Sequence, residues 1–209
     1  MDTVKYIVDK YGEPFKKIEG VRRVDFYSDF RELGFTEGVE IGVHQGSNAR
    51  AMFNAIPNLK LHCVDCWSEV EGRKRGQQKR YYRRMKNALE KERISGQANI
   101  IKKWSMDAVK HFKRESVDFV YIDANHNYDF VMQDIIEWSR IVRMGGIVSG
   151  HDYHYKRPHC GVLHAVQNYT SFHHLNYYWL DDDKKRPSRT KRGKTQTNNT
   201  WFFIKGWKT

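Results

Sequence analysis

The stretch that decides the fold is Gly38-Val39-Glu40-Ile41-Gly42-Val43-His44-Gln45-Gly46-Ser47-Asn48-Ala49. Its residues 39–43 predict a strand that runs into a tight turn, and a helix follows the turn. Gly42 and Gly46 carry no Cβ, so a ligand can approach the backbone closely at both positions. The spacing E-x-G-x-x-x-G differs from the G-x-G-x-x-G of dinucleotide-binding proteins, which disfavours a nicotinamide cofactor.

Apolar runs that predict strands alternate along the chain with stretches that predict helices. We expect strands at 38–43, 60–65, 98–102, 117–122 and 145–149. Helices are expected at 47–55, 76–93, 105–113, 128–142 and 161–171. Two late apolar runs, 175–180 and 200–204, predict a terminal hairpin. The expected fold class is therefore α/β, with a doubly wound, mostly parallel seven-stranded sheet and an antiparallel C-terminal hairpin.

The length of the chain suits a single domain over residues 1–209. Its 209 residues are 39% hydrophobic, which is enough to build one core. Three segments are expected to add to the sheet and its helices. They are an N-terminal helical extension at 1–35, a basic lid-like insertion at 69–93, and a basic loop at 184–198 that connects the strands of the hairpin.

The formal net charge of the chain is +12, from 37 basic and 25 acidic side chains. Much of the basic charge lies in the insertion 69–93 and in the loop 184–198. Runs of charge usually form solvated surface, and they can also attract an anionic substrate or a nucleic acid. Both interpretations stay open at this point.

Three features of the sequence favour a cytoplasmic protein. The first residues lack the apolar core of a signal peptide, and no apolar run is long enough to span a bilayer. The three cysteines do not form the pattern of a disulfide framework. We therefore expect a reducing compartment and no membrane partner, while the sequence does not indicate an oligomeric state.

Polar side chains follow the predicted strands at the edge where a doubly wound sheet binds its ligands. Asp65 follows the second strand, where an acid can accept hydrogen bonds from both ribose hydroxyls of a nucleoside. Asp107 follows the third strand, and it either accepts from an adenine amino group or caps the next helix. The fourth and fifth strands are followed by Asp123, His126, His151 and Asp152.

Two longer motifs carry a resemblance to a known family. They are Ser116-Val117-Asp118-Phe119-Val120-Tyr121-Ile122-Asp123-Ala124-Asn125-His126-Asn127-Tyr128 and Gly150-His151-Asp152-Tyr153. With Asp134, Trp138 and Gly145-Gly146, they resemble the Rossmann-like class I S-adenosylmethionine-dependent methyltransferases over roughly residues 36–205. Within that class the chain is similar to small-molecule O-methyltransferases, including the catechol and macrolide-sugar types. The resemblance implies S-adenosylmethionine as the cofactor and a hydroxyl oxygen of a small, acidic or sugar-like molecule as the acceptor.

The resemblance also implies a role for each matching residue. The implied contacts are Glu40, Gly42 and Gly46 with the methionine part of the cofactor, Asp65 with the ribose, Ser105 and Asp107 with the adenine, and Asp123 with the methyl donor and the acceptor.

Many relatives of this type hold a divalent ion with an acid after strand four and two consecutive residues after strand five. The matching residues here are Asp123, His151 and Asp152. Such an ion, Mg²⁺ or Mn²⁺, would stabilise the acceptor oxygen as its proton leaves. Because magnesium prefers oxygen ligands, the imidazole of His151 suits manganese, iron or zinc better, and the use of a metal stays open. His126 is a candidate for the general base, or it is a buried histidine that hydrogen-bonds its own loop.

Three arginines of the basic insertion, Arg80, Arg83 and Arg84, are expected to meet an acidic or phosphorylated acceptor. A nucleic-acid methyltransferase that acts on ribose 2′-oxygens is an alternative, because basic clusters also fit RNA. Enzymes that methylate base amino groups usually carry a Pro-Pro-aromatic motif after strand four, whereas Asp123-Ala124-Asn125-His126 contains no proline. A cofactor-binding module without catalysis is the second alternative.

Overall fold

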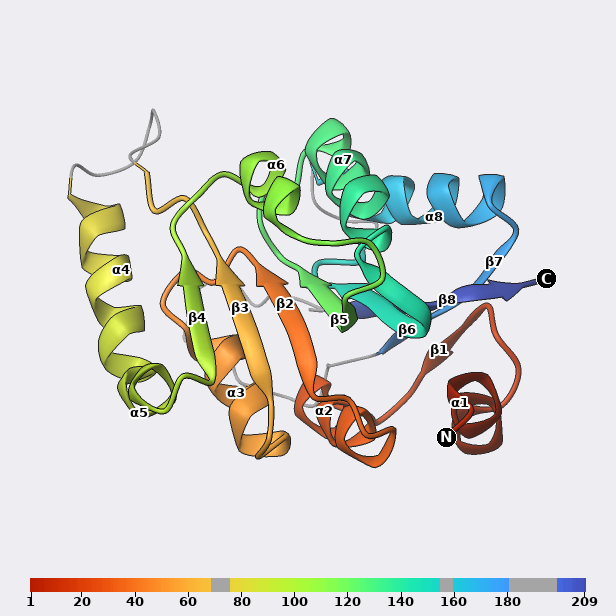
Figure 1. Ribbon diagram of the computed structural model, residues 1–209. Helices are drawn as coiled ribbons and strands as arrows, with labels where there is room; N and C mark the ends of the chain where they lie inside the picture. Colours follow the sequence, from red (N-terminus) through yellow and green to blue (C-terminus); the bar gives the residue numbers. More distant parts are fainter. Residues whose placement is uncertain (69–75, 155–159, 181–198) are drawn as a thin grey trace, which may run out of the picture.

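The computed structural model describes residues 1–68, 76–154, 160–180 and 199–209, and a single mixed sheet forms its centre (Figure 1). The strands are β1 (Lys16–Ile18), β2 (Glu37–Ile41), β3 (Lys60–Val64), β4 (Ala98–Ile101), β5 (Val117–Ile122), β6 (Val142–Gly150), β7 (Leu175–Leu180) and β8 (Thr200–Lys208). They lie in the order β1-β7-β8-β6-β5-β2-β3-β4. Neighbouring strands are parallel except where β8 pairs with β6 and with β7.

Helices cover both faces of the sheet (Figure 1). On one face lie α1 (Thr3–Tyr11), α2 (Arg23–Glu32) and α3 (Ser47–Ala55). On the other face lie α6 (Ser105–Ala108), the short 3₁₀ helix η1 (Val109–His111), α7 (Tyr128–Ser139) and α8 (Val162–Phe172). The crossover from β3 to β4 contains α4 (Gln77–Ala88) and α5 (Glu90–Ile94), beside the edge strand β4.

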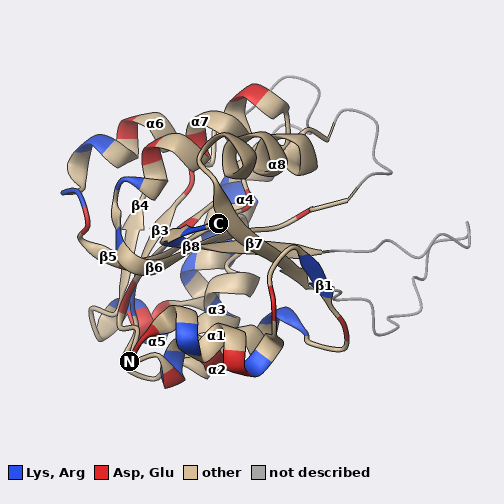
Figure 2. Cartoon of the chain, turned by 90° about the vertical axis from the view of Figure 1, so that its right-hand side faces the viewer, with Lys and Arg blue, Asp and Glu red and all other residues tan. Residues whose placement is uncertain are grey.

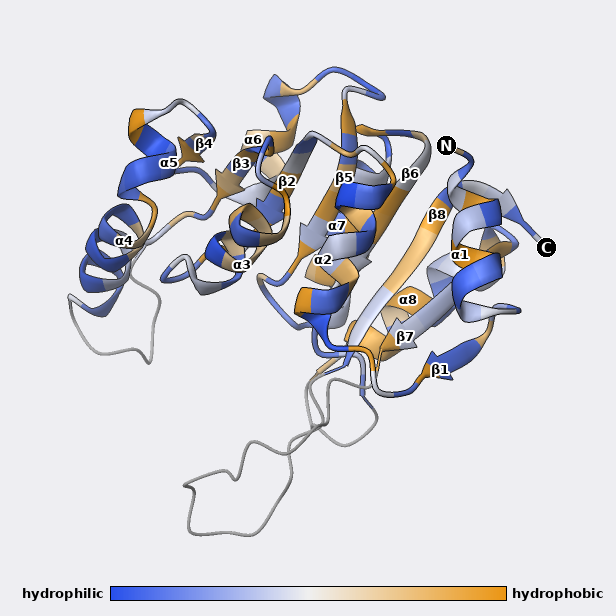
Figure 3. Ribbon diagram, turned by 90° about the horizontal axis from the view of Figure 1, so that it is seen from below, coloured by the Kyte–Doolittle hydropathy of each residue, from blue (hydrophilic) through white to orange (hydrophobic). Residues whose placement is uncertain are grey.

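Side chains on each strand alternate between two hydrophobic cores, as the period of a strand requires. On β5, Phe119 and Tyr121 point into the core beneath α1 to α3, whereas Val120 and Ile122 point into the core beneath α6 to α8. Figure 3 shows hydrophobic residues on the strands that α1 and α2 cover. Both faces of the central strands are therefore buried, which is the usual state of a parallel sheet.

The predicted fold class is confirmed, and the sheet contains one strand more than the seven that the sequence predicts. The additional strand is β1, which lies inside the expected N-terminal extension and pairs in parallel with β7. The described part of the basic insertion, 76–93, folds as the crossover helices α4 and α5. Its first residues, 69–75, and the whole basic loop at 184–198 lie outside the described residues.

Charged side chains lie mainly on the helices and loops around the sheet (Figure 2). Among the described residues, no helix combines the length and the apolar composition needed to cross a membrane. Cys63, Cys66 and Cys160 are free thiols.

Candidate active site

The carboxyl ends of β2, β3, β5 and β6 lie next to one another, because these four strands are parallel neighbours in the sheet. The loops that leave these ends hold most of the residues that the sequence singles out. Gly42 marks where two of the loops touch. Its φ is +90°, and a Cβ on it would lie 2.1 Å from the backbone oxygen of Asp123. Two features therefore require a glycine at position 42: the positive φ of its turn, and the close approach of the backbone that follows β5.

The carboxylate of Asp65, which follows β3, holds the glycine loop together. It accepts one hydrogen bond from the backbone N–H of His44 and one from that of Trp67, each at 2.8 Å. The indole Nε1 of Trp67 donates back to the carbonyl of His44 at 2.8 Å. His44 and Trp67 both have positive φ angles, 54° and 41°, a strain that these hydrogen bonds help to maintain. Each carboxylate oxygen has a second lone pair, so Asp65 is still able to accept from ribose hydroxyls.

Glu40 is almost fully buried at the end of β2, with 1% of its surface exposed. Its Oε1 accepts a hydrogen bond from Asn48 Nδ2 at 2.9 Å, and Asn48 Oδ1 accepts from the hydroxyl of Tyr27 at 2.6 Å. Its Oε2 has no hydrogen-bond partner among the described residues. Burial raises the pKa of Glu40 to about 8, against the smaller opposing effect of the Asn48 hydrogen bond. At a pH below this value, the favoured form of the free protein has an uncharged carboxyl group with one unused oxygen next to the glycine loop.

Three side chains from the loops after β5 and β6 converge; we call Asp123, His126 and Asp152 the carboxylate–histidine cluster. His126 Nε2 lies 3.3 Å from Asp123 Oδ1 and 3.2 Å from Asp152 Oδ2. One ligand atom from each of the three residues lies within 4.8 Å of the other two. Asp152 is buried and has a φ of +56°. This left-handed backbone conformation costs free energy in a residue other than glycine, and it sets the direction of the Asp152 side chain.

Two further histidines flank the cluster. His151 Nδ1 lies 3.8 Å from Asp123 Oδ2 and 3.7 Å from Asp152 Oδ1, and His154 Nε2 lies 3.5 Å from Asp152 Oδ1. The three residues expected to bind a metal, Asp123, His151 and Asp152, thus lie side by side. The imidazole of His126 lies closer to both carboxylates than that of His151 does. Two carboxylates and an imidazole form a donor set that suits borderline divalent ions such as manganese, iron or zinc. The residues present fit a divalent metal of that kind.

The two residues expected at the adenine lie at the start of α6, and their side chains have partners elsewhere. The hydroxyl of Ser105 donates to the Asp134 carboxylate on α7 and accepts from Trp138 Nε1, the latter at 2.8 Å. Burial raises the pKa of Asp134 to about 6, and the Ser105 hydrogen bond opposes that shift. Asp107 pairs with Lys110 at 2.9 Å, and this hydrogen bond holds the pKa of the Asp107 carboxyl below its ordinary value. The adenine contacts of Ser105 and Asp107 stay a prediction.

Sequence reasoning missed a polar network that α2 contributes from the N-terminal segment. Arg23 Nη1 donates to the hydroxyl of Tyr121 at 3.3 Å, and Tyr121 shares a hydrogen bond with Thr200 at 3.2 Å. Tyr27, one helical turn after Arg23, binds Asn48 in the glycine motif. Arg23 and Tyr121 are 98 residues apart, so no local spacing could have connected them. The sequence offered one indication of a role for Tyr121: it alternates with aliphatic residues along β5, so its side chain points to the opposite face of the sheet from theirs.

The first helix of the basic insertion is fixed to the glycine loop. Arg84 Nη1 donates to Gln45 Oε1 at 2.8 Å, and the ring of Tyr81 packs edge-on against His44 with centroids 4.1 Å apart. Arg80 and Arg83 are exposed on the same helix. The structure brings none of the three expected acceptor arginines into hydrogen-bond contact with the carboxylate–histidine cluster, as far as the described residues show. Their contact with an acceptor stays a prediction.

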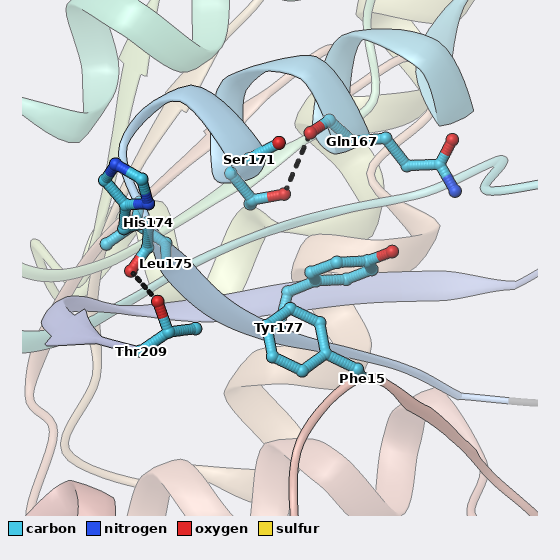
Figure 4. A pocket seen from close by; sticks show the side chains of 8 residues that line it. Phe15, Gln167, Ser171, His174, Leu175, Tyr177 and Thr209 are labelled. Carbon is cyan, nitrogen blue, oxygen red and sulfur yellow. Dashed lines mark hydrogen bonds between the residues drawn. The ribbon is translucent and has the colours of Figure 1, made fainter.

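A separate pocket lies between the end of α8 and the beginning of β7 (Figure 4). Its lining includes Phe15, Gln167, His174 and Tyr177, and none of the described residues that line it is a lysine, arginine, aspartate or glutamate. None of the candidate site residues lines it. The polar residues that the sequence singles out lie mainly at the carboxyl ends of the strands instead.

Comparisons with known proteins concern the family and the fold of the chain. The family model described as a methyltransferase domain matches residues 39–153, which run from β2 through Tyr153. No curated protein matches the chain in sequence.

Solved structures are similar to the chain over most of its length. An O-methyltransferase of tomaymycin synthesis from Streptomyces achromogenes, TomG, solved with SAM, has 14% identity and a TM-score of 0.61, covering 88% of this chain and 79% of that chain. An O-methyltransferase from Bacillus cereus solved with SAH has 12% identity and a TM-score of 0.62, covering 98% and 91%. A Clostridium thermocellum protein named as a candidate rRNA-methylase has 10% identity and a TM-score of 0.62, covering 90% and 98%.

At these identities the structural likeness establishes the fold, whereas the family follows from the match in sequence. That match covers more than half of the chain and includes Glu40, Asp65, Asp123 and Asp152. The protein therefore belongs to the methyltransferase-domain family and has the Rossmann-like fold of the S-adenosylmethionine-dependent methyltransferases.

Proposed function

We propose that the protein transfers a methyl group from S-adenosylmethionine to a hydroxyl oxygen of a small acceptor molecule. The observation that carries this proposal is the carboxylate–histidine cluster beside the Gly42 turn. The acceptor oxygen would attack the sulfonium methyl carbon, the carbon–sulfur bond would break, and S-adenosylhomocysteine would leave. The hydroxyl proton must go to a base, and positioning of the two reactants supplies the rest of the catalysis.

The cofactor would lie across the ends of β2 and β3. Glu40 offers the unused Oε2 to the amino group of the methionine part, and Asp65 offers its remaining lone pairs to the ribose. Gly42 and Gly46, with φ angles of +90° and +82°, would shape the loop after β2 around the methionine part of the cofactor, and Ser105 and Asp107 would lie towards the adenine. The Streptomyces and Bacillus neighbours were solved with SAM and SAH in this fold, which supports the choice of cofactor.

His126 is the residue that we propose as the proton acceptor. Its imidazole lies between the carboxylates of Asp123 and Asp152, which would stabilise the imidazolium that forms when the ring takes a proton. Asp123 would also face the methyl donor, because its backbone lies against Gly42. The exposed cations Arg80, Arg83 and Arg84 would favour an acidic acceptor.

The same cluster supports a metal-assisted form of the reaction. A divalent ion, manganese in preference to magnesium, would be held by Asp123, Asp152 and a histidine, and it would supply Lewis-acid stabilisation of the acceptor oxygen. His126 Nε2 is either a metal ligand or the site of a proton, but not both at once. If His126 is a ligand, His151 is the histidine left beside both carboxylates.

Calorimetry with S-adenosylmethionine tests the cofactor, and release of S-adenosylhomocysteine from panels of catechol-like and sugar hydroxyl acceptors tests the reaction. We expect micromolar cofactor affinity that falls in Asp65→Ala, and turnover that falls at least 100-fold in His126→Ala. Addition of Mn²⁺ after chelation separates the two mechanisms: restored turnover establishes the metal, and unchanged turnover under chelation establishes His126 as the base. Absence of cofactor binding with and without Mn²⁺ would overturn the proposal.

A further inference from the structure

A strip of positive charge runs along α4 and continues past the end of β4. Its members are cationic side chains, all exposed except the partly buried Lys86, and we call them the α4–β4 strip: Lys79, Arg80, Arg83, Arg84, Lys86, Lys102 and Lys103. No acidic residue occurs in α4 itself, and the first acid after it is Glu90 at the start of α5. Helix α4 therefore contributes charge of one sign only to the strip.

The positive charges of the strip have few partners among the described residues. Lys103 Nζ lies 2.6 Å from His111 Nε2, and its charge, after the hydrogen bond of Lys110, also lowers the pKa of the Asp107 carboxyl. No ion pair connects any of its members to an acid in the described parts of the chain. Lys79 with Arg83 and Arg80 with Arg84 are like-charged pairs four residues apart on one helix, and each such pair lowers helix stability. Lys86 and Lys102 also lie over the same ring, that of Tyr82, at 5.3 and 5.2 Å from its centroid.

Buried side chains of α4 and its C-cap anchor this positively charged helix to the rest of the protein. Met85 and Leu89 are fully buried under the helix, and Tyr82 packs on Trp67 with centroids 4.9 Å apart. The apolar residues of α4 thus face inward and leave no hydrophobic edge for insertion into a lipid surface. A membrane partner is disfavoured for this reason, and a flexible polyanion in water is favoured.

An exposed aromatic ring adjoins the strip. Trp104 follows Lys102 and Lys103 directly and is 56% exposed, although a tryptophan usually buries most of its surface. Cations that follow a phosphate backbone, together with an exposed ring on which a base stacks, are the two elements of single-strand binding sites. We propose that the α4–β4 strip and Trp104 bind a single strand of nucleic acid, independently of which acceptor receives the methyl group.

The test is fluorescence anisotropy with the full-length protein and labelled oligo(U) and oligo(dT) of about 12 nucleotides, long enough for one such site. The first variant is Lys79→Gln, Lys102→Gln and Lys103→Gln together, which spares the arginines proposed for the acceptor. Its matched control removes three exposed cations elsewhere, with Lys5→Gln, Lys113→Gln and Arg114→Gln. The second variant is Trp104→Ala.

We expect the strip variant to weaken binding at least 10-fold and the control to change it less than about 2-fold. Between about 50 and 200 mM KCl, loss of three phosphate contacts should reduce the slope of log K against log salt by about 2. Trp104→Ala should weaken binding about 5- to 20-fold with the salt slope unchanged, because stacking releases no counterions. Tighter binding of oligo(U) than of oligo(dT) would identify RNA as the preferred strand.

Three results would overturn the proposal: no binding at about 50 mM KCl, equal weakening by the strip and control variants, or binding that does not change in Trp104→Ala. Vesicles containing phosphatidylserine that bind more tightly than either oligonucleotide would overturn it in favour of a membrane. Calorimetry of the strip variant with S-adenosylmethionine separates this proposal from the proposed function. Unchanged cofactor affinity shows that a loss of oligonucleotide binding is local to the strip.

Discussion

Two regions at the same edge of the sheet use their carboxylates in opposite ways. In the glycine-loop region, residues 42–48 with Asp65, the carboxylate of Asp65 accepts two backbone N–H groups at 2.8 Å. In the carboxylate–histidine cluster, the carboxylates of Asp123 and Asp152 face imidazole nitrogens at 3.2 to 3.8 Å. One acid maintains a backbone shape, and the others face groups that can exchange protons or bind a metal.

The difference indicates a division of labour between the two regions. A loop held by backbone hydrogen bonds presents a fixed surface, which suits recognition of a cofactor common to many enzymes. A cluster in which titratable side chains of two loops face one another suits chemistry on the acceptor. The two regions meet at Gly42, so substitutions there and on either side of it test whether the division is real.

Gly42→Ala should have the largest effect, because it affects both regions at once. Its Cβ would overlap the backbone oxygen of Asp123 at 2.1 Å and the backbone carbon at 2.5 Å, and the φ of +90° adds strain. We expect the free energy of unfolding to fall by more than about 4 kcal/mol, measured by urea denaturation. Gly34→Ala is the control, because its φ is +75° and no atom lies within 4 Å of the added Cβ.

The control should lose about 1 kcal/mol, the cost of the left-handed backbone alone. Equal losses in Gly42→Ala and Gly34→Ala would show that the loop after β5 moves freely away from the glycine turn. In that case the two regions would not be coupled through their backbones.

Asp152→Asn should reduce turnover 100- to 1,000-fold, equivalent to about 3 to 4 kcal/mol of transition-state stabilisation. Asparagine tolerates the φ of +56° at this position, so the substitution removes the charge and keeps the backbone. The affinity for S-adenosylmethionine should change by less than about 3-fold, because the variant leaves the glycine-loop region intact. Asp9→Asn, which alters an exposed pair with Lys5, is the control. A variant with full turnover would remove Asp152 from the chemistry.

Asp65→Ala should lower the free energy of unfolding by about 3 kcal/mol, because two N–H groups lose a charged acceptor. Asp65→Asn keeps one acceptor oxygen and should lose about 1 kcal/mol. Cofactor affinity should fall together with stability across the two variants, measured by calorimetry and urea denaturation. A loss of affinity with unchanged stability would mean that Asp65 acts on the ligand alone.

The sequence predicts the central strands because strands buried on both faces appear as continuous apolar runs. It misses β1 because Lys16-Lys17-Ile18 buries only Ile18, and its strand state depends on pairing with Tyr178, Trp179 and Leu180 far along the chain. No local pattern carries that information.

The sequence predicts the neighbourhood of the site because parallel strands end at one edge. It does not predict which imidazole lies between the carboxylates, since the geometry of the loop at 123–127 places His126 closer than His151. It also cannot show that Ser105 turns towards Asp134, which lies 29 residues later on another helix. Such contacts depend on packing between elements.

Glu40→Gln should have the smallest effect, and it appears only as a change with pH. The pKa of Glu40 is about 8 in the folded protein, above the ordinary value of 4.5, so the native state keeps a proton that the unfolded chain has lost. The free energy of unfolding of the wild type should therefore fall as pH rises from about 5 to about 8. Between pH 6 and pH 8 the wild type should lose about 2 kcal/mol more than Glu40→Gln, since one pKa unit is worth about 1.4 kcal/mol.

Urea denaturation at pH 6, 7 and 8 measures this difference, with exposed Glu32→Gln as the control. The titration of Asp134, with a pKa of about 6, occurs in all three proteins and cancels in the comparison. Parallel pH profiles for wild type and Glu40→Gln would mean that Glu40 is already ionised. A charged acid with one unsatisfied oxygen would then lie buried at the end of β2, next to the glycine-loop region. Diverging profiles would instead show that Glu40 keeps its proton in the free protein at neutral pH.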